Sequence, residues 1–473
     1  MIALASLVLP IGTGWVWCRA VGALLAERSW MARILHAGLA VALGFGASSA
    51  LFFLLSWAGI ASLPVIATSE ITLLAAGAAL MTRRREADLT APQRLTYFDF
   101  MLLAALVALM CLAGAVAART YAGAPHGRWD AWAIWNLRAR YFAGEGTWRN
   151  AVSPLLAETH PDYPLATSSL IARTWLYGGR EFDTAVPLAI AALYALATLL
   201  ILVGAVGTIR GPTLGLLAGC VLLGVGNWVA EIGSQYADVP LSLYFVGAVS
   251  LLATAIATDR PRGAILAGAL AGLGAFVKNE GLAFAAVVLI ALALTAQGRR
   301  QWPAFAIGLA PALALVAAFK FFVAPSDPVL SQGSGLMLSK VADLSRWSAI
   351  ASGFASRIWT LSDWYAHPLL LAGAVLFFFR PNRETRMQAM TLWIASALML
   401  AAYLTAYVIT LSDLKWQIDT STDRLLVQIL PAALVSVFIA AAPLAVQEMP
   451  TAPKLQASRK AGKKPVKAGR ANR

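Results

Sequence analysis

The chain has 473 residues, of which 59% are hydrophobic and only 13% are charged. This composition excludes an ordinary soluble domain and is typical of an integral membrane protein. Lysine and arginine outnumber aspartate and glutamate by 37 to 23, which gives a formal net charge of +14, but eight of these cations lie in an acid-free tail after Pro453. Most of the others separate apolar runs, so their placement indicates lipid headgroups and argues against a nucleic-acid partner.

Apolar runs long enough to cross a bilayer as helices recur along the chain. They predict an all-α polytopic integral membrane protein with about thirteen transmembrane helices. The first run lacks the basic start and the cleavage site of a secretory signal and is expected to be retained. The predicted spans are residues 2–18, 35–57, 61–81, 98–117, 185–207, 213–230, 239–257, 263–277, 281–296, 303–323, 367–379, 387–410 and 425–446.

Some local patterns concern packing rather than chemistry. Cys18, Cys111 and Cys220 lie inside apolar runs without paired spacing, so they predict neither a disulfide nor a zinc site. The stretch "GALAG" at 268–272 has the small-residue spacing that permits close helix packing. In the segment 324–366, apolar and charged residues alternate near helical spacing, which predicts a helix along the membrane surface.

The spans and their connections divide the chain into regions. We interpret residues 1–81 as additional N-terminal transmembrane helices, 82–97 as a basic cytoplasmic linker, 98–446 as the transmembrane core and 447–473 as a basic disordered cytoplasmic tail. If the helices alternate in direction, the short basic connections lie on the same side as the tail, which the positive-inside rule places in the cytoplasm. The outer face then receives the long loops 118–184 and 324–366.

The first of these loops opens on "RWDAWAIWNLRARYF", residues 128–142, which combines indoles, arginines and one carboxylate. Asp130 follows a span closely, so we expect it near the outer membrane surface, among Trp129, Trp132 and Trp135. One interpretation is an aromatic anchor with a solvated Asp–Arg pair. The other is a carboxylate whose pKa is tuned for catalysis by desolvation and by nearby arginines.

A second polar cluster follows in the same loop, within "ETHPDYPLATSSLIARTWLY". Its prolines stiffen a turn by fixing φ and disfavouring helix in the preceding residues. The turn holds Glu158, His160, Asp162 and Tyr163. Rigidly held acids beside an apolar stretch suit a site that acts on a membrane-borne substrate, although a single histidine near carboxylates is also common in structural turns.

Together, "WDAWAIWNLRAR" and "HPDYPLATSSLIA" resemble the first outer loop of GT-C superfamily glycosyltransferases, in particular protein O-mannosyltransferases and the bacterial lipid A aminoarabinose transferases. "YADVP", "KNEG" and "TSTDRLLVQILPA" also resemble family positions at outer helix ends, and the likeness covers roughly 98–446 as architecture. The sequence departs from the family pattern in two places. Asp130 is not followed by glutamate, and Leu165 replaces the second proline of the turn.

The resemblance implies a glycosyltransferase that moves a sugar from a polyprenyl-phosphate donor to a lipid, glycan or protein acceptor. It implies a multi-pass protein of the bacterial inner membrane with its site on the periplasmic face. The implied partners are this donor, the acceptor and membrane lipids. The sequence identifies no certain cofactor and no metal ligands, and leaves the use of a divalent metal open.

Residue roles follow from what this transfer requires, a base for the acceptor proton and a cation for the departing phosphate. Asp130 is the expected general base, with Asp162 as the alternative, and Arg424 is the first choice for the donor phosphate, helped by Lys278. The further substrate-binding candidates are Arg138, His160, Tyr163, Asp238 and Glu280.

Simpler structural roles compete with each of these assignments. Arg424 is equally well explained by snorkelling or by a pair with Asp423. Lys278 and Glu280 form a plausible structural pair, and for Asp238 helix capping is the favoured interpretation over sugar binding.

Three alternative functions fit the sequence less well than this glycosyltransferase. A lipid-linked glycan transporter or flippase predicts ionisable residues near the bilayer midplane, whereas here they gather at one face. An O-antigen-ligase-like enzyme is expected to depend on a late, large loop, yet the acids lie in the first one. A membrane scaffold gives no reason for this clustering.

Overall fold

The computed structural model describes residues 2–22, 29–82, 95–144, 148–179, 182–361 and 367–442, excluding the side chains of residues 157, 158 and 330. Every regular element in these ranges is helical. The predicted linker lies mostly outside the described residues, and the predicted tail lies entirely outside them. The all-α prediction is therefore confirmed for the described part of the chain.

Nine helices of the described chain are long and apolar enough to cross a membrane. They confirm a multi-pass membrane protein by length and composition. The first span combines α1 (Ile2–Ala5) and α2 (Val8–Val21), and the others are α3 (Trp30–Trp57), α4 (Leu63–Thr82), α5 (Tyr97–Gly123), α8 (Ala185–Arg210), α11 (Asp238–Thr258), α14 (Ala296–Phe322), α18 (Arg383–Val408) and α19 (Leu414–Ala440).

The remaining predicted spans correspond to shorter or broken helices. The run 213–230 is divided into α9 (Pro212–Leu223) and α10 (Gly226–Ser234), which are bent by 67°. The shorter helices are α12 (Pro261–Val277), α13 (Asn279–Leu294) and α17 (Pro368–Phe378). At 1.5 Å per residue, the 17 residues of α12 rise only about 26 Å, somewhat less than the hydrocarbon core. The described chain thus has nine candidate spans, or ten with the bent pair, and the predicted count of thirteen is not confirmed.

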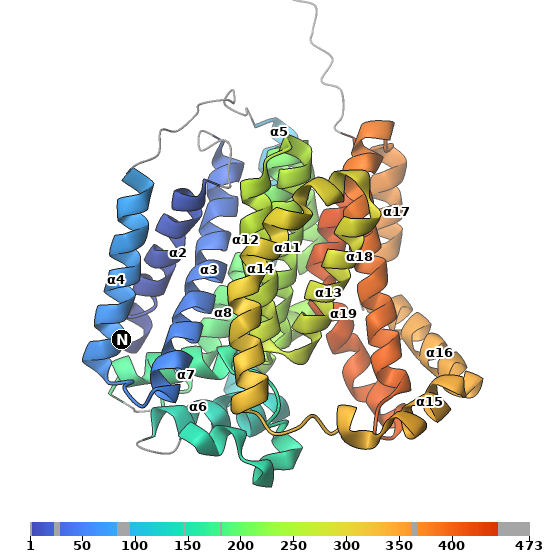
Figure 1. Cartoon of the computed structure of the whole chain (residues 1–473). Coiled ribbons are helices and arrows are strands. Elements are labelled where there is room, and N and C mark those ends of the chain that lie inside the picture. Colours follow the sequence, from blue (N-terminus) through green and yellow to red (C-terminus); the bar gives the residue numbers. More distant parts are fainter. Residues whose placement is uncertain are drawn as a thin grey trace, which may run out of the picture.

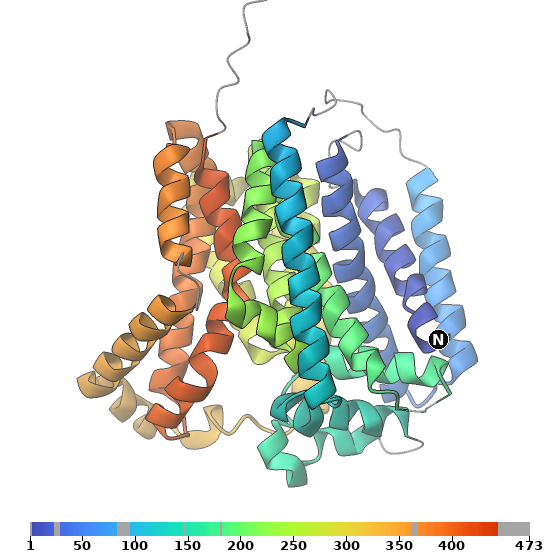
Figure 2. The same ribbon diagram turned by 180° about the vertical axis from the view of Figure 1, so that it is seen from behind.

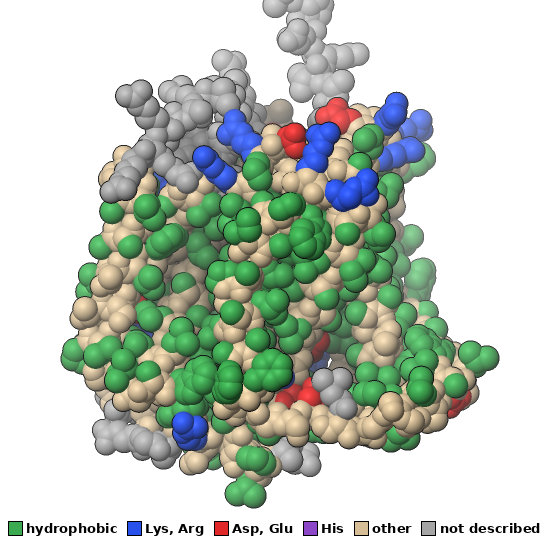
Figure 3. All heavy atoms as spheres, viewed as in Figure 1, with side chains coloured by type: hydrophobic (Ala, Val, Ile, Leu, Met, Phe, Trp, Pro, Cys, Tyr) green, Lys and Arg blue, Asp and Glu red, His purple; other side chains and the backbone are tan. Residues whose placement is uncertain are grey.

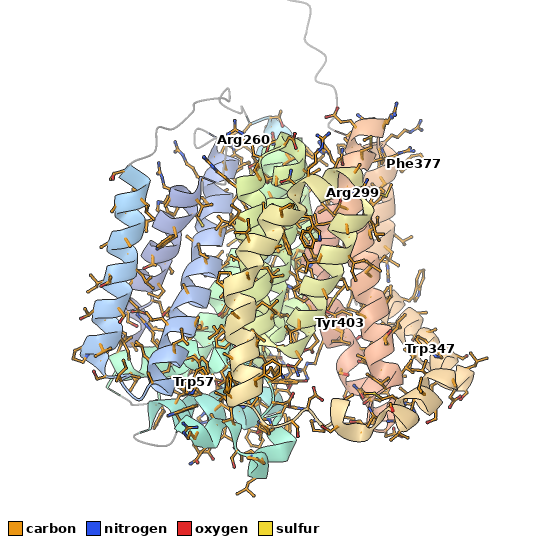
Figure 4. The ribbon with its side chains drawn as sticks, in the orientation of Figure 1. Trp57, Arg260, Arg299, Trp347, Phe377 and Tyr403 are labelled. Atoms are coloured by element: carbon orange, nitrogen blue, oxygen red, sulfur yellow. The ribbon has the colours of Figure 1, made fainter. Side chains whose placement is uncertain are left out.

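The helices run up and down between two ends of the bundle (Figures 1 and 2). One end, the upper one in Figure 3, gathers Lys and Arg side chains. Arg260 and Arg299 lie there (Figure 4). We call the opposite end, which carries α6 (Asn136–Ala143), α7 (Ala166–Tyr177), α15 (Ser334–Ala342) and α16 (Leu344–Thr360), the loop end. Four short helical turns complete the described elements: η1 (Ala131–Trp135), η2 (Trp148–Val152), η3 (Pro154–Thr159) and η4 (Leu330–Gln332).

The core of the bundle is built around α11, which packs against α8, α12 and α19. The helices approach one another closely where their side chains are small. A Cβ added at Gly268 would lie 2.0 Å from the backbone oxygen of Phe305 on α14, so the "GALAG" stretch does mark a tight helix contact. At the periphery, α5 begins with a capping box in which Thr96 and Asp99 satisfy each other's backbone N–H groups.

Helices α15 and α16 extend sideways from the bundle at the loop end (Figures 1 and 2). Leu338 and Leu344 are exposed, whereas Arg357 turns back to α19 and pairs with Asp419 at 3.2 Å and Asp423 at 3.1 Å. Helices occur where the sequence predicted them. Their contact with the membrane surface stays a prediction, and residues 362–366 of this segment lie outside the described chain.

The charge inside the predicted span 61–81 is neutralised by a distant arginine. Glu70 on α4 forms a bidentate pair with Arg173 on α7, through contacts of 2.9 and 2.5 Å, and both side chains are buried. Ser48 and Tyr177 also donate to this carboxylate. The pair therefore ties the N-terminal helices to the segment that carries the site.

We expect Glu70→Gln to lower the free energy of unfolding by about 3–5 kcal/mol, because it leaves the Arg173 charge buried without a partner. Unfolding in detergent, followed by tryptophan fluorescence, measures this. Thr72→Val is the matched control on the same helix, since Thr72 is exposed and bonds only locally to Thr68. A Glu70→Gln protein as stable as the control would show that the pair contributes no net stability.

Candidate functional site

Asp130 is positioned by the short connection that follows α5. Gly127 has φ +79°, and a Cβ there would lie 2.4 Å from the Cβ of Ala131, so the turn requires glycine. The Arg128 N–H then donates to the carbonyl of Ser234 at the end of α10. The chain next forms η1, a single π-helical turn that begins immediately after Asp130. Such turns are frequent at functional sites.

The Asp130 carboxylate binds Arg424, which comes from the first half of α19. Arg424 Nη2 lies 2.5 Å from Asp130 Oδ2 and 2.9 Å from Asp238 Oδ2, and its Nε lies 3.0 Å from the same Asp238 oxygen. The guanidinium also lies 4.4 Å above the ring of Tyr236. One arginine therefore joins two carboxylates from segments more than a hundred residues apart.

Asp238 is the buried centre of this cluster, with a side chain that is 0% exposed. Its second oxygen accepts from Lys278 Nζ at 3.0 Å and from Gln428 Nε2 at 2.5 Å. Gln428 is fixed in turn by the Tyr403 hydroxyl, at 2.7 Å. Asp238 is the first residue of α11, as the capping interpretation expected, but the described hydrogen bonds of its carboxylate come from side chains of other segments.

Lys278 occupies the break between α12 and α13, where an extended residue reverses the chain. Besides Asp238, it contacts Glu280 at 2.9 Å, so the predicted Lys278–Glu280 pair is present. Burial by itself lowers the pKa of Lys278, but Asp238 and Glu280 outweigh it and raise the pKa above its ordinary value. Lys278 is thus a charged ammonium group at the loop end.

The His160–Tyr163 turn lies beside this cluster. Arg138 is fully buried and donates to the carbonyl oxygens of His160 and Tyr163, at 2.5 and 3.0 Å. Its role is to hold the turn, and although burial lowers its pKa to about 10, it stays charged at neutral pH. His160 stacks on Tyr163, with ring centroids 4.7 Å apart, and burial lowers the histidine pKa, which favours the neutral ring.

The Asp162 carboxylate faces α13 and α14 rather than Arg424. It accepts from Asn279 Nδ2 at 2.8 Å and lies 3.7 Å from Lys320 Nζ, which also donates to the Asp162 carbonyl. Because Asn279 precedes Glu280 and follows Lys278 in the chain, the turn adjoins the main cluster. The Glu158 side chain lies outside the described residues.

The structure decides among the interpretations that the sequence left open. Arg424 binds Asp130 and Asp238, whereas Asp423 binds Arg357, so the predicted pair with Asp423 is not among the described ion pairs of Arg424. The three tryptophans of the predicted aromatic anchor differ in their exposure. Trp129 and Trp132 are about half exposed, at 50% and 52%, but Trp135 is buried and lies beside Tyr163.

Sequence reasoning missed several members of the site. Asn279 stood inside the noted "KNEG" motif, and Lys320 was a lone cation within a predicted span, which was a usable signal. No feature of the local sequence indicated that Gln428 and Tyr403 would belong to the site. Figure 4 places Tyr403 toward the loop end of the bundle, on α18.

The residues of the site do not fit a metal ion. In the ranges that the structure describes, no three His, Cys, Asp or Glu side chains converge to hold one. The carboxylates of Asp130 and Asp238 are instead bound by guanidinium and ammonium groups. We therefore assign no step to a metal.

One side of the bundle has a lateral hollow. Figure 3 shows a largely apolar side of the bundle with a depression near the loop end, where acidic and basic side chains are visible. Partial exposure of Arg424 (19%), Glu280 (20%) and Lys320 (24%) agrees with access to this charged region from outside. No family model matches the chain, and no curated protein or solved structure is significantly similar to it.

Proposed function

We propose that this protein is a membrane glycosyltransferase that moves a sugar from a polyprenyl-phosphate donor to an acceptor hydroxyl. The observation that carries the proposal is the Asp130–Arg424–Asp238–Lys278 cluster at the loop end of an apolar bundle. It combines a carboxylate that can accept a proton with cations that can hold a phosphate. The lateral hollow supports a donor whose lipid tail stays in the bilayer.

The donor phosphate is assigned to Arg424 and Lys278. Arg424 uses Nε and Nη2 for its carboxylates, while its Nη1 donates to no described residue. A guanidinium has five N–H donors in a planar fork, so this edge can bind a phosphate oxygen while Asp238 keeps the group in place. Lys278 supplies a second positive charge 3.0 Å from Asp238.

Asp130 is the proposed general base. The acceptor oxygen forms a bond to the anomeric carbon of the donor sugar while the bond from that carbon to the phosphate oxygen breaks. The acceptor proton passes to the Asp130 carboxylate, and polyprenyl phosphate leaves with its charge stabilised by Arg424 and Lys278.

The same proposal includes the number of membrane crossings and their orientation. The short helices α12, α13 and α17 and the bent pair α9–α10 complete thirteen crossings. The basic end faces the cytoplasm of a bacterial inner membrane, and the loop end, with the site, faces the periplasm. A lipid, glycan or protein supplies the acceptor hydroxyl.

Polyprenyl phosphate alone is expected to raise the melting temperature of the purified protein, because a ligand that binds only the folded state stabilises it by about 2.7 kcal/mol at a hundredfold excess over Kd. Polyprenol of the same chain length is the matched control, since it has the tail without the phosphate. Equal stabilisation by both lipids would show that the phosphate is not recognised.

A further inference from the structure

A cavity of about 500 Å³ lies where α5 gives way to η1 and α6, and the proposed reaction makes no use of it. Its volume is within the range of about 300–1,000 Å³ that is usual for small-molecule sites. The wall is formed by the connection 124–127, by Trp132 on η1, and by Asn136, Leu137 and Arg140 on α6.

Arg140 gives this wall a positive charge. Arg140 and His126 are exposed, and the guanidinium of Arg140 lies 5.5 Å from the ring of Phe182. Among the described side chains, no carboxylate forms a salt bridge with Arg140. Its charge is therefore available to an anionic ligand.

Asn136 provides a second indication of a ligand. It is 95% buried, since only 5% of its surface is exposed, and its amide group donates to the His126 carbonyl at 3.0 Å. Its Oδ1 has no hydrogen-bond donor within the described chain. Buried acceptors are nearly always paired, and because this oxygen has almost no accessible surface, a hydroxyl group in the cavity reaches it through a small rotation of the Asn136 side chain.

The position of the cavity indicates a membrane lipid. Helix α5 has the smallest buried share of the described candidate spans, 11%, so most of its length is available to acyl chains. The cavity lies directly beyond its end, beside the half-exposed Trp129 and Trp132. Tryptophan is enriched where helices leave the hydrocarbon layer, so this is the expected depth of lipid headgroups.

We propose that the cavity binds the headgroup of an anionic phospholipid with free hydroxyls, such as phosphatidylglycerol. The phosphate is held by Arg140, a glycerol hydroxyl donates to Asn136, and the acyl chains lie along the exposed face of α5. This site is separate from the Asp130–Arg424 cluster, so the proposal does not depend on the glycosyltransferase function.

Native mass spectrometry of the full-length protein, released from mixed phosphatidylglycerol and phosphatidylcholine micelles, tests this. We expect selective retention of phosphatidylglycerol, reduced about tenfold or more by Arg140→Gln, the scale of one lost charge-assisted hydrogen bond. Arg149→Gln is the matched control, because Arg149 is an exposed arginine of the same loop that stacks on Trp148 outside the cavity wall. Asn136→Asp, which adds a negative charge to the cavity, should also reduce retention.

Several results would overturn the proposal. One is equal retention of both phospholipids by the unaltered protein, and another is unchanged retention in Arg140→Gln. Glycerol 1-phosphate is added as a competitor to distinguish a lipid from a soluble anion. We expect it to displace little lipid, and displacement at concentrations near those of the lipid would assign the cavity to a soluble phosphate ester instead.

Discussion

Replacement of Asp130 by asparagine is expected to slow sugar transfer by about 10²–10⁴-fold, the usual contribution of a general base. The amide keeps the size of the side chain but cannot take the acceptor proton. Donor binding should persist, because Arg424 remains anchored by Asp238 through contacts of 3.0 and 2.9 Å. The measurement is initial-rate sugar transfer by purified protein at saturating donor.

Asp162→Asn is the matched comparison in the same loop. Its carboxylate is occupied by Asn279 and Lys320, so we expect a smaller loss of rate than in Asp130→Asn. If Asp162→Asn abolishes turnover while Asp130→Asn keeps a near-normal rate, the base is Asp162. Asp130 would then be an anchor for Arg424.

Arg424→Gln is expected to weaken binding of polyprenyl phosphate by about 1.5–3 kcal/mol, which is roughly 10- to 150-fold in Kd. Asp238 still has Lys278 and Gln428 as partners in this variant, so the fold should be retained. Arg424→Lys should recover only part of the affinity, because an ammonium group keeps the charge and loses the planar fork.

Arg357→Gln is the control for Arg424. Arg357 also pairs with acidic residues of α19 at the loop end, but its partners are Asp419 and Asp423, outside the cluster. Its replacement should leave donor affinity within about twofold of the unaltered protein, as expected for a partly exposed ion pair. Equal losses in both variants would mean a general electrostatic effect, and an unchanged Kd in Arg424→Gln would remove the arginine from the phosphate site.

The helices were largely predictable because hydropathy is a local property. Each predicted apolar run coincides with a described helix or, at 2–18 and 213–230, with a pair of helices. The bend of 67° between α9 and α10 was not predicted, although Gly224, Gly226 and Asn227 lie at the break. The count of thirteen spans is not confirmed, because short helices such as α17, with 11 residues, also appear as apolar runs in the sequence.

The site was predictable as a set of residues but not as a set of contacts. Asp130, Lys278 and Arg424 were selected because polar groups at helix ends are conspicuous in so apolar a chain. Their pairing could not be read from the sequence, because Asp130 and Arg424 are 294 positions apart. The partners of Asp238 were not predictable for the same reason, since those on α19 and at the α12–α13 break are all distant in sequence.

Arg138 and Glu70 are two further charged residues whose buried partners the sequence did not identify. Arg138 was selected as a substrate-binding residue, but it is fully buried beneath the His160–Tyr163 turn. Glu70, an isolated charge in a predicted span, is matched by Arg173 from another segment. In both cases the sequence indicated that a charge had to be accommodated, and only the tertiary structure identifies what accommodates it.

The most direct test of the proposed function follows a labelled sugar presented on polyprenyl phosphate to the purified protein in vesicles. If the protein is a transferase, the label appears on an acceptor, polyprenyl phosphate is released in equal amount, and both products fall together in Asp130→Asn. If the labelled sugar instead crosses the bilayer while still attached to its carrier, with no release of polyprenyl phosphate, the protein is a transporter and the assignment of Asp130 as a base is wrong.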